Sequence, residues 1–231
     1  MKHTTGYVLV LIVLTLVSAV LGQTTGKAPS VKGQSTTKSL NISSQNFLGV
    51  NEGQVYSNKY FRLRLTAPDG WLVQQREVGI AIKNLGKRTV TGKSAQMQKA
   101  LNDASSRVTV LLTVSKDIMG MPNNSTLILS AEKTPPLLQV RNGRDYLRFN
   151  IETFKKVKLP EDFKYSENIE AEKFGTETLY YLQITRSFGS QRVYAFARNG
   201  YALFFTLTYT SDEELDTLRN IFATADLSWK G

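Results

Sequence analysis

The stretch QRVYAFARNGYALFFTLTYTSDEELDTLRNIF, residues 191–222, decides the fold. Residues alternate with a period of two on both sides of Asn199-Gly200, a pair that accepts the positive φ angles of a type I′ turn. The pattern predicts two antiparallel strands joined by a tight hairpin. The second strand is apolar on much of both faces, which predicts a central place in its sheet. One of these faces is formed by Ala202, Phe204, Thr206 and Thr208.

A helix is predicted directly after the hairpin. Ser211 and Glu214 have the spacing of a capping box, and three carboxylates in the first turn suit the positive end of a helix dipole. Leu215, Leu218 and Phe222 then recur as an apolar stripe. We interpret the acidic cluster as helix-start chemistry rather than a metal or acid–base site, because no residue with ligand spacing accompanies it.

The first 45 residues are not expected to belong to the folded domain. Residues 1–22 combine Lys2 with an apolar run, 7–22, that is shorter than the roughly 20 residues of a membrane span, which predicts a signal peptide. Cleavage is expected after Gly22 or Ala19, and an uncleaved anchor is the alternative. Residues 23–45 are rich in Ser, Thr and Lys, which predicts a disordered linker. Residues 46–231 then form a single domain.

Strands follow strands along this domain with few helices between them. Strands are predicted at 61–65, from Trp71, at 79–84, 105–117 and 126–132, on both sides of Gly175-Thr176, and at 225–227; helices are predicted at 95–105 and 142–158. Hairpin connections of this kind form antiparallel sheets. The predicted fold is therefore α+β, a mostly antiparallel sheet with helices packed on its faces.

The chain contains no cysteine, and its one histidine is His3, inside the predicted signal peptide. A mature protein without these side chains has no Ser-His-Asp or Cys-His catalysis, no His-dependent zinc site and no His-ligated haem. We therefore predict no catalytic, cofactor-binding or metal-binding residue, and no cofactor.

The net charge is +10, of which the first 45 residues contribute four lysines and no carboxylate, leaving +6 on the domain. The cations are scattered over Arg62 and Arg64, the loop cations Lys83, Lys87, Arg88 and Lys93, and Lys155, Lys156 and Lys158. We interpret them as a solvated surface. An anionic surface or lipid is an alternative partner, whereas nucleic acid is not expected for an exported protein.

Two short patterns have a structural and a functional interpretation. Met119 and Met121 lie close together, but without a third soft ligand we expect them to pack in a loop. Asn41, Asn123 and Asn124 match the N-glycosylation acceptor pattern.

Three stretches resemble the PsbP/Mog1-like α-β-α sandwich superfamily, most of all its exported bacterial members of unknown function. They are YFRLRLTAPDGW, LLTVSKDIMGMPNN and GYALFFTLTYTSDEELDTLRNIFATADL, and the resemblance covers most of residues 56–228. It rests on an aromatic strand before Pro68, Gly70 and Trp71, and on a hydrophobic strand that leads into an acidic helix start. The resemblance implies a binding or assembly role and carries no catalytic residue.

The expected function is that of an exported, non-catalytic domain that binds a protein or assists assembly at the cell envelope, in the periplasm or outside the cell. One alternative is a carrier of an apolar small molecule or lipid, lined by the aromatic C-terminal strands, although the same residues suffice as core. The second is a hydrolase that uses two of Asp145, Glu161, Asp162 and Glu167. Such a pair needs a separation of roughly 5–10 Å, which nothing in the sequence sets.

Overall fold

The computed structural model describes residues 46–74, 76–81, 106–119, 121, 123–134, 139–156, 159–187 and 189–229. Outside the described residues lie the predicted signal peptide and linker, the helix predicted at 95–105, the loop cations, Asn41 and Lys158. No helix in the described part of the chain is long and apolar enough to cross a membrane.

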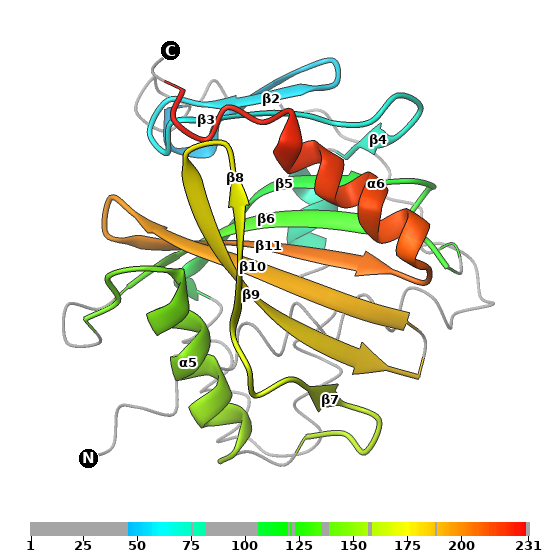
Figure 1. Cartoon of the computed structure of the whole chain (residues 1–231). Coiled ribbons are helices and arrows are strands. Elements are labelled where there is room, and N and C mark those ends of the chain that lie inside the picture. Colours follow the sequence, from blue (N-terminus) through cyan, green and yellow to red (C-terminus); the bar gives the residue numbers. More distant parts are fainter. Residues whose placement is uncertain are drawn as a thin grey trace.

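The larger sheet has eight strands, and every pairing in it is antiparallel (Figure 1). Its order is β4-β5-β6-β11-β10-β9-β7, and β8 also pairs with β9. The strands are β4 (Leu72–Val73), β5 (Val108–Ser115), β6 (Thr126–Lys133), β7 (Lys164–Tyr165), β8 (Glu170–Phe174), β9 (Glu177–Arg186), β10 (Gly189–Arg198) and β11 (Tyr201–Tyr209). The predicted mostly antiparallel α+β fold is confirmed.

The hairpin of β10 and β11 forms as predicted. Asn199 and Gly200 have φ angles of 52° and 76°, and the strands pair in unbroken register from Arg198 opposite Tyr201 to Ser190 opposite Tyr209. β11 lies between β6 and β10, and all of its residues except the first are buried. Its predicted central place is therefore confirmed, because both of its faces pack against other layers.

A second, three-stranded sheet was not predicted from the sequence. It consists of β1 (Val50–Glu52), β2 (Val55–Asn58) and β3 (Leu63–Thr66), in that order. The strand predicted at 61–65 is β3. The strand predicted at 225–227 is reduced to a single bridge between Asp226 and Arg64.

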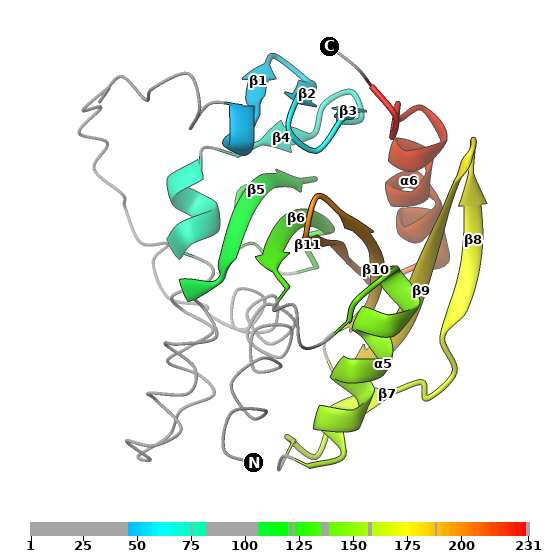
Figure 2. The same ribbon diagram turned by 90° about the vertical axis from the view of Figure 1, so that its left-hand side faces the viewer.

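Two helices cover opposite faces of the larger sheet (Figures 1 and 2). The first, α5 (Gly143–Phe154), packs over β9 and β10, and the second, α6 (Asp212–Ala223), packs over β11 and beside β3. The buried side chains accordingly form two clusters, one on each face. The helix predicted at 142–158 ends at Phe154, four residues early.

The strand predicted at 79–84 is wrong, because residues 76–81 are helical. Gly79 lies against β5, where a Cβ atom would be 2.7 Å from Val110 Cγ1. A glycine allows the backbone of this short helix to approach the sheet closely. The apolar run Gly-Ile-Ala-Ile is too short for its period to distinguish a helix from a strand.

Candidate functional site

The start of α5 is fixed by two capping interactions and one close approach. Asn142 is the N-cap, and its Oδ1 accepts a hydrogen bond of 3.0 Å from the backbone N–H of Asp145. The Asp145 carboxylate in turn accepts one of 3.1 Å from the backbone N–H of Arg141. A Cβ atom on Gly143 would lie 1.8 Å from the carbonyl oxygen of Ala195, so only glycine lets the helix meet β10 here.

The inner side of α5 carries a buried polar contact within an apolar layer. Tyr146 stacks on Phe204 at a ring separation of 5.6 Å, and its hydroxyl donates a hydrogen bond of 2.8 Å to Glu132 Oε2. Burial raises the pKa of Glu132 to about 7, although the Tyr146 hydrogen bond and the Arg107 charge both lower it. Arg107 Nε lies 4.0 Å from Glu132 Oε1. Glu132 is only 3% exposed, so we assign its carboxyl group a structural role.

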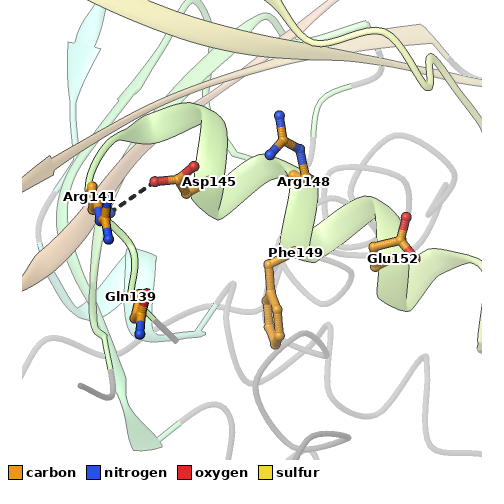
Figure 3. Close-up of a pocket in the computed structure, with 6 residues that line it drawn as sticks. All are labelled: Gln139, Arg141, Asp145, Arg148, Phe149 and Glu152. Carbon is orange, nitrogen blue, oxygen red and sulfur yellow. Dashed lines mark hydrogen bonds between the residues drawn. The ribbon is translucent and has the colours of Figure 1, made fainter. Parts of the chain in front are cut away.

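The outer side of α5 carries four cations and one aromatic side chain. We call it the α5 surface and define it as Arg141, Arg144, Arg148, Phe149 and Lys156. The four cations are exposed and Phe149 is half-buried. A shallow groove of about 400 Å³ follows the helix here (Figure 3) and is lined by Gln139, Arg141, Asp145, Arg148, Phe149 and Glu152. Figure 3 shows Arg148 and Phe149 leaving the helix in opposite directions.

The arginines of the α5 surface gain little from the helix dipole or from one another. Arg141 and Arg144 lie at the N-terminus of α5, where the helix dipole disfavours a cation by about 0.3–1 kcal/mol. Arg148 is four residues from Arg144, and like charges at this spacing repel. Among the described residues, the ion pairs do not include these three arginines, although Arg144 lies 5.9 Å from the ring centroid of Tyr180. Their positions suit a partner outside the domain.

Three of the four carboxylates considered for a hydrolase are engaged in structural contacts. Asp145 caps α5. Asp162 accepts hydrogen bonds of 3.0 and 2.9 Å from Arg186, which lower its pKa together with bonds from Ser187. Glu167 lies 2.8 Å from Lys155 Nζ, so this lysine of the predicted solvated surface is paired. Glu161 is exposed.

The acidic start of α6 has the predicted structural role. Ser211 is the N-cap and accepts a hydrogen bond of 3.3 Å from the backbone N–H of Glu214. The Glu214 carboxylate reaches past Ser211 and accepts from the backbone N–H and the hydroxyl of Thr210. Burial raises the pKa of Glu214, but hydrogen bonds from Thr210 and Lys116 outweigh it and lower the pKa to about 2.

The methionines and acceptor asparagines lie in or beside the loop between β5 and β6. Met119 packs against the core on the α5 side, whereas Met121 is exposed. No group of three or more His, Cys, Asp or Glu side chains in the described ranges could hold a metal ion. Asn123 is exposed, and the Asn124 amide donates to the carbonyl oxygens of Asp117 and Ile118.

Neither a protein-family model nor a curated protein matches the chain. Among solved structures, the chain is similar to the solution structure of cyanobacterial PsbP (CyanoP) from Synechocystis sp. PCC 6803. The identity is 16%, the match covers 77% of this chain and 94% of that chain, and the TM-score is 0.39. It is also similar to the crystal structure of LpqN, involved in cell envelope biogenesis of Mycobacterium tuberculosis. There the identity is 16%, the coverage 71% and 81%, and the TM-score 0.36.

The α5 surface was missed in the sequence, although its signal is present. Arg141, Arg144 and Arg148 follow one another at spacings of three and four residues, which places them on one side of a helix. On this helix, only the lysines at the other end stood out in the sequence. The sequence does not show that Lys155 is neutralised by Glu167, whereas the three arginines have no such partner among the described residues.

Proposed function

We propose that this chain is an exported, non-catalytic domain that binds an acidic segment of a protein partner through the α5 surface, at the cell envelope. The observation that carries the proposal is a group of three exposed arginines that form no ion pair among the described residues, on the same helix as the half-buried ring of Phe149. No chemical step is assigned to the surface.

The composition of the α5 surface is that of a protein interface. Arginine and aromatic residues are enriched at the centres of such interfaces and among the residues that dominate binding energy. A guanidinium group binds a carboxylate through two parallel hydrogen bonds, which gives specificity for Asp or Glu. Phe149 and the groove beside it offer an apolar contact for a neighbouring side chain of the partner. The surface therefore suits a segment with two or three carboxylates and one apolar residue.

Export is supported by the first part of the chain. Lys2 and the apolar run 7–22 have the features of a signal peptide, and residues 23–45 have the composition of a spacer. If the signal peptide is retained as an anchor, the spacer lets the domain reach partners near the membrane; if it is cleaved, the domain is free to diffuse to them. This places the proposed binding event at the envelope, in the periplasm or outside the cell.

The proposal is tested by capture from envelope extracts of the source cells. The variant Arg141→Glu/Arg144→Glu/Arg148→Glu reverses the charge of the α5 surface. The matched control Lys59→Glu/Lys164→Glu/Lys173→Glu changes the net charge equally at exposed lysines elsewhere. We expect wild type and control to retain the same protein, and the arginine variant to lose it. Equal retention by all three proteins would refute the role of α5.

An anionic membrane is the other target that these charges fit, and the same variants distinguish it. Vesicles of phosphatidylglycerol and phosphatidylcholine are floated with each protein at about 0.1 M salt, where surface charges act over roughly 10 Å. The proposal expects no co-flotation of wild type. If wild type and control float with the vesicles, the arginine variant does not, and no protein is captured, then the target is a lipid surface and not a protein.

A further inference from the structure

The face of the larger sheet that α5 partly covers carries a group of buried polar side chains at one end. Ser115, Thr126, Thr208 and Gln191 lie opposite one another across β5, β6, β11 and β10. In the next row, Thr113 and Thr206 both lie opposite Ile128. We call these six polar residues the buried polar row. Each of them is at most 6% exposed.

Four oxygen atoms of the buried polar row have no hydrogen-bond partner in the part of the chain that the structure describes. They are Thr113 Oγ1, Thr126 Oγ1, Thr206 Oγ1 and Gln191 Oε1. The other two members are paired: Ser115 Oγ accepts a hydrogen bond of 2.7 Å from Gln74 Nε2, and Thr208 Oγ1 accepts one of 3.1 Å from Gln191 Nε2. A buried polar group without a partner destabilises the folded state, because it loses its hydrogen bonds to water. Four of them on adjacent strands are uncommon in a native core, where almost all such groups are paired.

The buried polar row lies between two helices. At its β5 end is the helix at 76–81, where a Cβ atom on Gly79 would be 3.0 Å from Thr113 Oγ1. On the other side is α5, which packs mainly on β9 and β10. Figure 2 shows these helices at opposite sides of the same face, with β5, β6 and β11 between them. The four oxygens therefore share one region of this face.

We propose that the buried polar row is the floor of a binding site for a small, uncharged molecule that carries hydroxyl or amide groups. Threonine hydroxyls both donate and accept, and Gln191 Oε1 accepts, so a ligand with donors and acceptors complements neighbouring atoms of the row. The six side chains are uncharged, and a buried ionic ligand needs a partner of opposite charge. Ile128 and Val193, on the same face, supply apolar contacts beside the polar atoms. The site lies on the inner side of this face and is distinct from the α5 surface.

The proposal is tested with the full chain and two probes, methyl glucoside and N-acetylglucosamine, each up to tens of millimolar. Binding is measured as a shift of the thermal unfolding midpoint and as a mass increment in native mass spectrometry. Thr206→Val and Thr126→Val keep the side-chain shape and remove one hydroxyl each. Thr178→Val, at an exposed position on β9, is the control.

We expect at least one probe to stabilise wild type and the control, and each core variant to weaken that probe at least about tenfold. Without a probe, the core variants should unfold at the same temperature as wild type or higher, because removing an unpartnered hydroxyl removes its desolvation cost. Stabilisation unaffected by the core variants would overturn the proposal. So would the absence of any shift with both probes, which would make the row a static part of the core.

Discussion

The hydroxyl of Tyr146 on α5 donates a hydrogen bond of 2.8 Å to the carboxyl group of Glu132 on β6, inside the core. Glu132 lies opposite Val108 on one side and Ala202 on the other, so the contact joins α5 to the middle of the sheet. The protonation state of this carboxyl group is consequently linked to the packing of α5, the helix that carries the proposed binding surface.

Stability is predicted to fall as pH rises from about 5 to 7. Burial raises the pKa of Glu132 from its ordinary value of 4.5 to about 7. Between these values the folded protein keeps the proton and the unfolded chain loses it, so raising the pH favours unfolding. The loss is about 3 kcal/mol in the free energy of unfolding. Glu132→Gln, which stays neutral, should remove most of this slope when urea unfolding is measured from pH 4.5 to 8.

Tyr146→Phe provides the comparison for this experiment. It removes the donor to Glu132 and leaves the ring on Phe204, so it should destabilise the protein while preserving a pH slope. A wild-type free energy of unfolding that is constant between pH 5 and 7 would contradict the linkage.

Gly143→Ala is predicted to be among the most damaging single substitutions in α5. The added methyl group would overlap the Ala195 carbonyl oxygen, at 1.8 Å, and the helix would have to move away from β10. We expect a loss of more than about 3 kcal/mol, against changes within about 0.5 kcal/mol for Glu152→Ala on the exposed side. Urea unfolding gives both values. Equal stability of the two variants would show that α5 does not need this close approach.

Glu172→Ala is predicted to release the edge strand β8. Its carboxylate accepts a hydrogen bond of 2.5 Å from Tyr194 and one of 3.0 Å from Arg219 Nε, so it ties β8 to β10 and α6. Without it, backbone amides of Glu170–Phe174 should exchange with deuterium faster, while those of β11 keep their protection. Lys173→Ala, on the same strand and exposed, is the control and should leave the exchange unchanged.

Arg198→Ala is predicted to loosen the smaller sheet. One guanidinium nitrogen donates to the carbonyl oxygens of Phe61, at 2.7 Å, and Leu227, at 2.6 Å, and the other pairs with Glu177. Losing these bonds leaves partly buried carbonyl groups without a donor, at a cost of about 1–3 kcal/mol. Limited proteolysis should then cut within β1–β3 before it cuts the larger sheet. Arg64→Ala keeps these contacts and is the control. If it is cut at the same sites and at the same rate as Arg198→Ala, Arg198 does not have this role.

Elements fixed by neighbouring residues were predictable from the sequence. The turn at Asn199-Gly200 depends on two φ angles, and the start of α6 on a bond from Glu214 to Ser211, three residues away. The smaller sheet was not predictable in this way. Its contacts with the rest of the domain join Arg64 to Asp226 and Phe61 to Arg198, and the residues of each pair are more than a hundred positions apart.

The proposed sites also combine features set by neighbouring residues with features set by distant ones. The spacing of the arginines on α5 is visible in the sequence, and so is the common face of Thr206 and Thr208. What joins these threonines to Thr126 and Gln191 is the register of three strands, and register depends on packing across the whole sheet. A group assembled from separate strands cannot be read from any one of them.

The bridge between Arg64 and Asp226 brings the beginning and the end of the described chain to one corner. Asn46 accepts a hydrogen bond of 3.3 Å from the backbone N–H of Tyr60, on the turn that leads into β3. The protein is thus suited to circular permutation: a short peptide could join these ends, and the chain could be reopened at the exposed turn between β8 and β9. Every strand would keep its neighbours, and the new termini would offer attachment points for labels at Gly175 and Thr176, which are both exposed.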